Sequence, residues 1–200
     1  MRYANGRKES TRQAIIEAAG RRLKLDGVDG SGVTTLMNDA GLTNGAFYAH
    51  FSSKDELIAS AIADQLAQQR ATLRSVADDR DGVEAFVRRY LSAEHRDDRS
   101  NGCPSAALLN EVARCSDTVR AAYSSGVTAI IDDIAVVLDP DNRAPADGRT
   151  WNLIVSLIGT LQMARAIVDP YLSDAILQYG IDHAISLLGA ITRVSHHDEE

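Results

Sequence analysis

Apolar residues recur at helical spacing along most of this 200-residue chain. One such stripe contains Ile15, Ala18, Ala19 and Leu23, and similar stripes follow up to residue 191. No run alternates apolar and polar residues as a half-buried strand would. Because the pattern offers helices and no strands to pair, the sequence predicts an all-α fold.

Polar, glycine-marked and proline-marked breaks separate the predicted helices. The expected helices span residues 10–25, 33–40, 43–51, 53–76, 83–91, 105–138 (in two parts that meet near residue 116), 149–168 and 171–193. The segment DPDNRAPADG, residues 139–148, is expected to be a loop. Residues 194–200 form a polar tail, and we do not expect its His196–His197 pair to bind a metal.

Several helix starts have recognisable capping residues. Ser31 is the expected cap of the second helix, since Gly32 has no side chain, and the Thr43 hydroxyl suits the start of the third. Ser53 and Glu56 have the spacing of a capping box. Pro104 suits the first position of the sixth helix, where its missing N–H is not needed.

The last two helices are unusually apolar. Leu153, Leu157 and Leu161 in one, and Leu177 and Leu188 in the other, belong to apolar sets that spread beyond a single stripe. Such a surface requires a second surface to cover it. We therefore expect a homodimer in which helices 149–168 and 171–193 pair into a four-helix bundle, with a monomeric core as the alternative.

Charge is distributed unevenly along the chain. Residues 1–24 hold seven Lys or Arg and two Glu, whereas the whole chain has a net charge of −7, so the remaining 176 residues carry −12. A basic end and an acidic body indicate that the basic end meets a polyanion; a merely solvated basic arm is the alternative. With no apolar membrane span or secretion signal recognised, a cytoplasmic protein is expected.

The two cysteines are not expected to form a disulfide. Cys103 and Cys115 are 12 positions apart, or about 18 Å along a helix, far beyond disulfide reach. Neither they nor the scattered histidines have metal-ligand spacing, and no cofactor motif is present.

The stretch from Gly41 to Phe51 predicts a particular supersecondary unit. Two short helices joined by Ala40-Gly41-Leu42-Thr43 match a helix-turn-helix, whose second helix enters the DNA major groove by its N-terminal end. Phe47 and Phe51, four residues apart, can share one face and fix this short helix to the first.

The polar residues of the same stretch fit DNA contacts. Tyr48 and His50 can donate hydrogen bonds to phosphates, while Asn44 can pair with adenine and Gly45 allows close approach to base edges. Lys54, in the first turn of the following helix, adds positive charge for a phosphate.

Residues 10–62 resemble the DNA-binding domain of the tetracycline-repressor (TetR/AcrR) family. The resemblance rests on GVDGSGVTTLMNDAGLTNGAFYAHFSSKDELIASAI and on IIEAAGRRL before it. It implies DNA contacts at Thr34, Thr43, Tyr48, His50 and Lys54, with Asn44 and Gly45 at bases. Gly32 departs from the family's usual Thr or Ser, and Val28 from its usual aromatic residue.

The resemblance also implies two domains and an effector. Residues 1–52 would form a three-helix helix-turn-helix domain, and residues 53–193 a helical bundle for effector binding and dimerisation. The implied function is a repressor that a small, partly apolar molecule releases from DNA. The expected pocket residues are large or adaptable side chains: Phe86, Tyr90, Cys103, Leu108, Tyr123, Trp151 and Met163.

Cys103 suggests an alternative way of sensing. It immediately precedes Pro104 at an expected helix start, where a thiolate is favoured. The stretch GCPSAALLNEVAR resembles the start of the sixth helix in family members that sense electrophiles or oxidants through a cysteine. A thiol pKa at or above that of free cysteine would contradict this alternative.

Two further classes of protein are weaker alternatives. Gly27–Gly32 is not preceded by a strand or followed by GK[ST], and no HExxH or paired-cysteine motif appears, so an enzyme is not expected. A helical adaptor that does not bind DNA would leave Asn44, Tyr48 and His50 unexplained. Binding to a defined DNA duplex distinguishes these classes.

Overall fold

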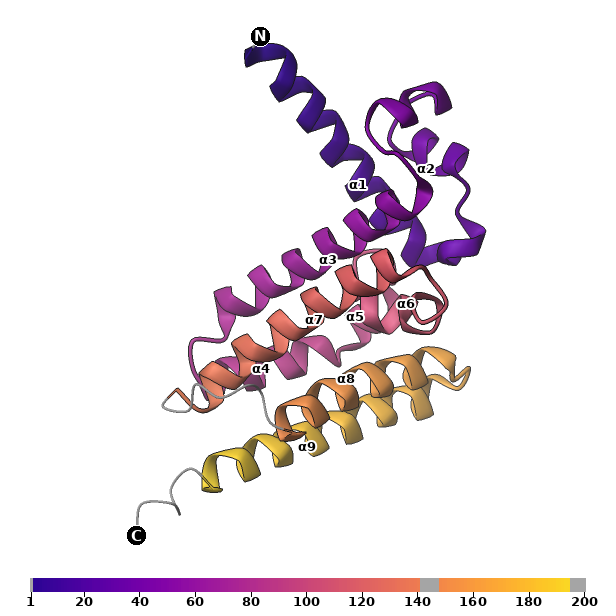
Figure 1. The fold of residues 1–200 in the computed structure, drawn as a ribbon. Coiled ribbons are helices and arrows are strands. Elements are labelled where there is room, and N and C mark those ends of the chain that lie inside the picture. Colours follow the sequence, from indigo (N-terminus) through magenta and orange to yellow (C-terminus); the bar gives the residue numbers. More distant parts are fainter. Residues whose placement is uncertain (1, 141–147, 195–200) are drawn as a thin grey trace. The chain divides into compact units, whose positions relative to one another are not determined.

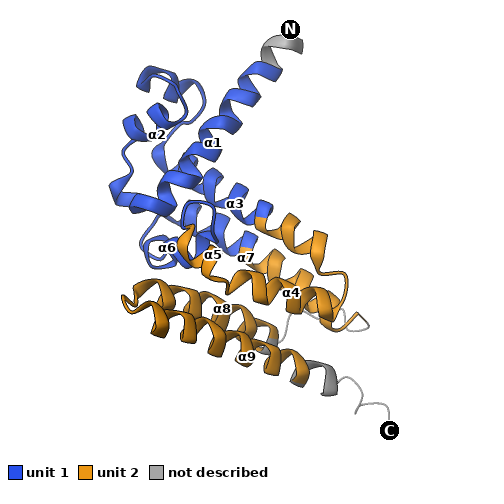
Figure 2. Cartoon of the chain, turned by 180° about the vertical axis from the view of Figure 1, so that it is seen from behind, with its two compact units in different colours: residues 1–68, 99–126 blue, residues 69–98, 127–200 orange. Residues whose placement is uncertain are grey.

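The computed structural model describes residues 2–140 and 148–194, and every regular element in these ranges is a helix. The chain divides into two compact units (Figure 2). Unit 1 contains residues 1–68 and 99–126, and unit 2 contains residues 69–98 and 127–200. The all-α prediction is confirmed. The predicted tail 195–200 and residues 141–147 of the predicted loop lie outside the described residues.

Unit 1 is built on its first helix (Figure 1). Its elements are α1 (Arg2–Gly30), α2 (Val33–Asp39), the 3₁₀ helix η1 (Asn44–Ala49), the first part of α3 (Lys54–Val76), α6 (Pro104–Val112) and the first part of α7 (Asp117–Leu138). Both α2 and α6 pack against α1. Ile15, Leu23, Leu36, Leu57 and Ile62 are completely or almost completely buried in this unit, which shows that the apolar stripe of α1 faces the core.

The first helix is longer than predicted. It begins at Arg2 rather than near Ser10, because the polar residues before Ser10 include good helix formers that need no packing partner. The predicted stop at Asp26-Gly27 corresponds to a kink: Gly27 has φ 77° and ψ 175°, and one more helical turn follows to Gly30. Glycine tolerates this positive φ without a steric cost.

The caps follow the prediction only in part. Gly32, not Ser31, is the N-cap of α2, and the Ser31 hydroxyl donates instead to the Gly27 carbonyl at 2.7 Å, so the expected Ser31 cap is wrong. Thr43 is the N-cap residue of η1 but makes no side-chain capping bond. One half of the predicted capping box is present, because the Glu56 amide donates to Ser53 Oγ at 3.1 Å, while the Glu56 carboxylate accepts from the amide of Ser52, one residue before the cap, at 2.8 Å.

Unit 2 consists mainly of packed helices from the second half of the chain. Its elements are the remainder of α3, α4 (Arg80–Tyr90), α5 (Ala93–Asp97), the remainder of α7, α8 (Gly148–Ala166) and α9 (Pro170–Val194). α8 and α9 lie side by side (Figure 1), and α9 also packs on α4. The predicted order of helices is confirmed, apart from α5, which was not predicted.

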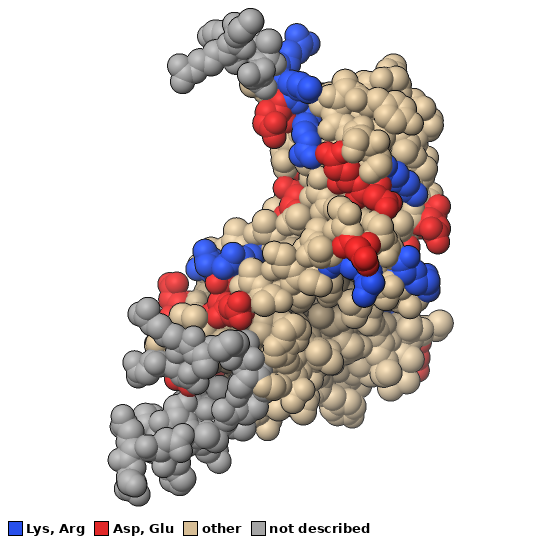
Figure 3. Space-filling model, in the orientation of Figure 1, with Lys and Arg blue, Asp and Glu red and all other residues tan. Residues whose placement is uncertain are grey.

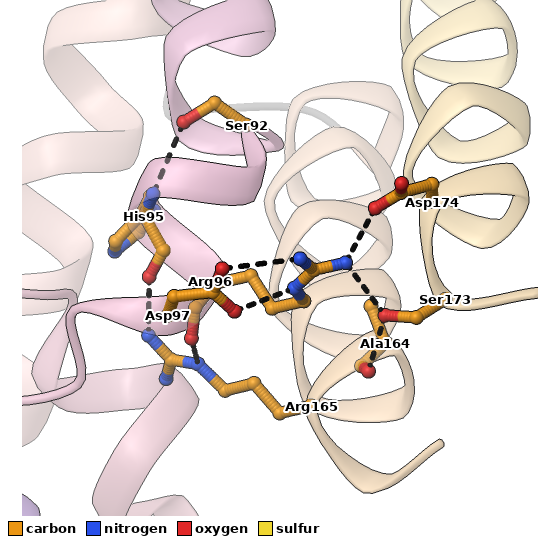
Figure 4. Close-up of polar contacts among 8 residues, drawn as sticks. All are labelled: Ser92, His95, Arg96, Asp97, Ala164, Arg165, Ser173 and Asp174. Atoms are coloured by element: carbon orange, nitrogen blue, oxygen red, sulfur yellow. Dashed lines mark hydrogen bonds and ion pairs between the residues drawn. The ribbon is translucent and has the colours of Figure 1, made fainter. Parts of the chain in front are cut away.

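A polar cluster holds α5 in place (Figure 4). Arg165 donates to the carbonyl oxygens of His95 at 2.8 Å and Arg96 at 3.0 Å, which satisfies groups that a five-residue helix leaves without internal partners. Arg96 in turn donates to Ser173 at 2.9 Å and Asp174 at 2.6 Å in α9. These long-range bonds explain how so short a helix persists.

An ion triad joins α3 to α7 within unit 2. Arg70 and Arg74, one turn apart on α3, each donate two hydrogen bonds to the Asp133 carboxylate at 2.6–2.8 Å. The Asp133 side chain is 15% exposed. The hydrogen bonds from Arg70, followed by those from Arg74, hold the pKa of Asp133 well below its usual range.

α7 corrects one expectation about membrane segments. Among the described helices, Asp117–Leu138 alone is long and apolar enough to span a membrane by length and composition. Of its apolar window, 22% is buried within the chain, and the helix also contains Asp133 of the ion triad. Cys103 and Cys115 do not form a disulfide with each other, as predicted.

The apolar residues that predicted pairing of α8 and α9 are largely used within the chain. Leu153, Leu157 and Leu161 are buried, and so are Leu177 and Leu188. A different set of large apolar side chains is exposed on α8, α9 and the short link between them: Trp151, Val155, Met163, Val168, Tyr171, Leu172 and Tyr179. These residues form what we call the exposed apolar set.

Candidate nucleic-acid interface

α2, the turn after it and the reading segment (residues 43–51) form the predicted helix-turn-helix. The Gly41 amide donates to the Asn38 carbonyl and the Leu42 amide to the Met37 carbonyl, both at 2.9 Å. Gly41 has φ 71°, a left-handed conformation that glycine adopts most easily at the end of a helix. The chain therefore turns sharply before the reading segment begins.

Two buried aromatic rings anchor the reading segment. Phe47 and Phe51 are 1% and 2% exposed, and their ring centroids lie 5.8 Å apart in a stacked arrangement. The Arg12 guanidinium of α1 lies 4.7 Å from the centroid of the Phe51 ring and also bonds Glu56 and Ser60 of α3. The predicted role of the two phenylalanines is confirmed.

The opposite face of the reading segment is polar and exposed. Thr34 on α2, and Thr43, Asn44 and Gly45 at the start of the segment, are all exposed. Tyr48 is 79% exposed and its ring packs edge-on against Phe47, with centroids 5.2 Å apart. A Cβ atom added at Gly45 would meet nothing within 4 Å in the free chain. Five of the seven predicted DNA contacts thus share an accessible region.

His50 and Lys54 are less accessible. His50 is half-buried, and its Nδ1 is enclosed without a hydrogen-bond partner among the described residues, so an external contact must use Nε2. The Lys54 ammonium donates to the Val28 carbonyl at 2.7 Å. An ammonium has three N–H donors, so this bond leaves Lys54 capacity for a phosphate.

Lys54 belongs to a group of contacts that we call the kink cluster: Gly27, Val28, Ser31, Lys54 and Glu111. Because the backbone leaves helical geometry at Gly27, the Val28 amide needs an acceptor from elsewhere. Glu111 of α6 supplies it, with Oε2 2.5 Å from the Val28 nitrogen. Side chains from α3 and α6 therefore hold the end of α1 just before the helix-turn-helix.

Glu111 also limits what can occupy position 27. A Cβ atom on Gly27 would lie 2.7 Å from both carboxylate oxygens of Glu111. Nearby, the Lys24 ammonium is buried and donates to Gln65 and to the Gly102 carbonyl. In the sequence, the only signal of a structural role for Glu111 and Lys24 is a charge near an apolar stripe.

The expected effector residues are divided between the two units. Cys103, Leu108 and Tyr123 belong to unit 1, and Phe86, Tyr90, Trp151 and Met163 belong to unit 2. Phe86, Tyr90 and Leu108 are buried, whereas Trp151 and Met163 are exposed. Tyr123 donates to Ser105 at 3.0 Å, and burial raises the pKa of Tyr123.

Cys103 is the N-cap residue of α6, as predicted, but it is only 6% exposed and makes no side-chain capping bond. Burial, followed by the nearby Asp55, raises the pKa of the other thiol, Cys115. Thiol-based sensing through Cys103 stays a prediction.

The regular elements of the described residues are all helices. After a tight turn, a buried aromatic pair holds a short segment whose polar side chains are exposed. These features define a helix-turn-helix protein. Residues 15–61 match the family model described as bacterial regulatory proteins, tetR family. The helix-turn-helix region of this chain is therefore similar to that of the tetR family, and the similar proteins are transcriptional regulators.

Curated relatives are similar over part of the chain. The HTH-type nicotine-responsive transcriptional repressor HdnoR of Paenarthrobacter nicotinovorans is 32% identical over 80 residues, covering 40% of this chain and 41% of the relative. The HTH-type transcriptional regulator LmrA of Bacillus subtilis is 25% identical over 117 residues, covering 56% and 62%. The chain thus matches less than two thirds of the length of either relative.

Solved structures are similar over most of the chain. The reduced form of E. coli NemR has a TM-score of 0.74 at 19% identity, covering 88% of this chain and 95% of that one. A TetR-family regulator from Agrobacterium tumefaciens has a TM-score of 0.72 at 16% identity, covering 88% and 98%. At these identities the likeness establishes the fold alone.

Proposed function

We propose that this protein is a cytoplasmic transcriptional repressor that binds a pseudo-palindromic DNA operator as a homodimer and is released by a small molecule. Residues 1–52 act as the DNA-binding domain and residues 53–193 as the effector and dimerisation domain. The observation that carries the proposal is the reading segment, which is anchored by Phe47 and Phe51 and exposes Thr43, Asn44 and Tyr48.

Each side chain has a role that its chemistry permits. Asn44 and the backbone at Gly45 read base edges, while Thr34, Thr43, Tyr48, His50 through Nε2, and Lys54 donate to phosphates. Phosphate contacts fix the register and base contacts supply the specificity.

The size of the reading segment and the exposed apolar set support the proposed dimer. Six residues of η1 can read only a few base pairs, so two copies spaced about one DNA turn, roughly 34 Å, are needed for a specific site. Val155 and Met163 on α8 and Tyr179 on α9 are 60–70% exposed and are suited to contact with a second copy.

Release requires that the effector bind the free form of the protein more tightly than the DNA-bound form. Within unit 2, the buried and largely apolar side chains of Phe86 and Tyr90 favour a partly apolar effector. The proposed mechanism involves no cofactor and no metal ion.

The test is to enrich duplexes from a random-sequence pool and to measure their binding by fluorescence anisotropy at physiological salt. We expect a pseudo-palindromic sequence that binds at least a thousandfold more tightly than a shuffled duplex. Tyr48→Ala should weaken this binding, whereas Asn110→Ala, an exposed change on α6 of the same unit, should not. Equal binding of enriched and shuffled duplexes by the wild-type protein would contradict the proposal.

A further inference from the structure

The N-terminal turns of α1 have no packing role within unit 1. Residues 6–10 are all exposed, and a Cβ atom added at Gly6 would meet nothing within 4 Å. Burial begins only further along, at Ile15 and Ile16. This exposed end of α1 extends beyond the packed part of the helix (Figure 1), and Lys and Arg side chains lie along it beside an acidic side chain (Figure 3).

The basic residues of α1 fall into two groups. Three of them bond to other parts of unit 1: Arg12 to Glu56 and Ser60, Arg22 to Asp26 and Asp39, and Lys24 to Gln65 and Gly102. The other three whose side chains are described, Arg7, Lys8 and Arg21, are exposed, and no ion pair joins any of them to another described residue; of these, only Arg7 and Lys8 lie at the exposed end of α1. Their positive charges remain available for an external partner.

The geometry of α1 places these charges beside the reading segment. Arg12 lies over the ring of Phe51, at the end of that segment. Lys8 precedes Arg12 by four residues, so it lies on the same face of the helix and about 6 Å further along the axis. Arg7 is the adjacent residue. The exposed turn that carries Arg7 and Lys8 therefore lies one turn beyond the point where α1 contacts the end of the reading segment.

We propose that Arg7 and Lys8 form a second DNA contact, which binds backbone phosphates flanking the bases read by the reading segment. This inference rests on the proposed function and assigns residues outside the helix-turn-helix. Flexible Lys and Arg side chains on an exposed helix suit the closely spaced phosphates of a duplex. Because phosphates carry no sequence information, the contact increases affinity for every sequence to a similar extent.

The contact has a specific thermodynamic signature. Each phosphate that a protein neutralises releases condensed counterions, which adds about 0.9 to the magnitude of the slope of log K against log salt concentration. Loss of two phosphate contacts per protomer should therefore reduce that magnitude by about 1.8 for each bound protomer. The ratio of specific to non-specific affinity should remain unchanged.

The experiment measures anisotropy titrations of the full chain at four salt concentrations, with an enriched duplex and with a shuffled one. The Arg7→Gln/Lys8→Gln double variant replaces both charges with a good helix former. Arg21→Gln is the matched control, because this exposed arginine is on the same helix about 20 Å from Lys8 and close to Asp39. The swap Arg7→Lys/Lys8→Arg retains both charges and should retain the wild-type slope.

Each outcome decides the proposal. A smaller slope for the double variant on both duplexes, with the control and the swap unchanged, supports it. An unchanged slope for the double variant overturns it while leaving the proposed function intact, since Tyr48→Ala tests that function separately. If the wild-type protein bound both duplexes equally and the double variant had a smaller slope, only the proposed sequence-specific regulation would be overturned, and the second DNA contact would stand. No binding to either duplex overturns both proposals.

Discussion

The reading segment and the α8–α9 pair use their exposed surfaces in opposite ways. The reading segment buries two aromatic side chains and exposes Thr43, Asn44 and Tyr48. The α8–α9 pair buries a continuous row of leucines, yet still exposes Val155, Met163 and Tyr179. A hydrogen-bonding surface suits a solvated polyanion, whereas an apolar surface suits a second protein surface. The contrast indicates different partners for the two regions.

The contrast also concerns how each region is stabilised. The reading segment is a single short 3₁₀ helix that depends on Phe47, Phe51 and Arg12. α8 and α9 are long helices, 19 and 25 residues, that pack along each other. A small number of contacts therefore determines the geometry of the reading segment, while the stability of the helical pair is spread over many contacts.

The largest expected effect comes from removing one anchor in each region. Phe51→Ala and Leu157→Ala should each lower the free energy of unfolding by about 2–5 kcal/mol, because each leaves a cavity in a packed core. Urea denaturation measures both losses. If the contrast is correct, Phe51→Ala also abolishes DNA binding under conditions in which the variant remains folded, whereas Leu157→Ala retains it.

A smaller loss of stability is expected when Glu111 of α6 is replaced, because this residue holds the end of α1 just before the helix-turn-helix. Glu111→Ala removes the acceptor of the Val28 amide and should lower the free energy of unfolding by about 1–3 kcal/mol. Hydrogen exchange should show faster exchange at the Val28 amide, with Asn110→Ala as the neighbouring control. Unchanged exchange would mean that another group takes over this hydrogen bond.

The ion triad of unit 2 should make stability depend on pH. Arginine hydrogen bonds lower the pKa of Asp133 in the folded protein, so its contribution is complete above the unfolded pKa of about 4 and is lost as the pH falls through the folded value. Asp133→Asn should therefore cost about 1–2 kcal/mol at pH 7, after allowing for solvent screening of the exposed Arg74.

The measurement is denaturant unfolding between pH 7 and pH 3. The difference in the free energy of unfolding between the wild-type protein and Asp133→Asn should become smaller below about pH 4. Asp132→Asn, an exposed neighbour on α7, should show no such narrowing. If the free energy of unfolding of Asp133→Asn differed from that of the wild-type protein by the same amount at every pH, the ion triad could not be the cause of the difference.

The smallest effects on folding should come from the two exposed surfaces. Tyr48→Ala and Met163→Lys should each change the free energy of unfolding of the single chain by no more than about 0.5 kcal/mol. Each variant should nevertheless weaken binding to a different partner. Tyr48→Ala should lose DNA affinity and remain dimeric, while Met163→Lys should weaken dimerisation, as measured by analytical ultracentrifugation. If Met163→Lys leaves the dimer intact, the second copy binds elsewhere.

The sequence predicted those features that depend on residues close together in the chain. Phe47 and Phe51 could be assigned to one face because they are four positions apart, and the Ser53–Glu56 spacing predicted a capping box. Gly41 was recognised as a turn, and its positive φ explains why glycine is needed there.

Features that depend on distant residues were missed. The short α5 is held by Arg165, about 70 positions away, and Arg96 in turn bonds Asp174. The Ser31 cap failed because the kink at Gly27 presents a carbonyl to the Ser31 hydroxyl. The predicted α8–α9 surface used residues that the chain itself buries, since periodicity does not distinguish an internal neighbour from a second copy.

The kink cluster has a consequence for how this sequence can vary among homologues. Gly27 leaves space for the Glu111 carboxylate, and Glu111 supplies the acceptor that the kink at Gly27 requires. The two positions, 84 residues apart in the chain, therefore constrain each other. In an alignment of close homologues, we expect positions 27 and 111 to covary, with a side chain at 27 found only where 111 is shorter.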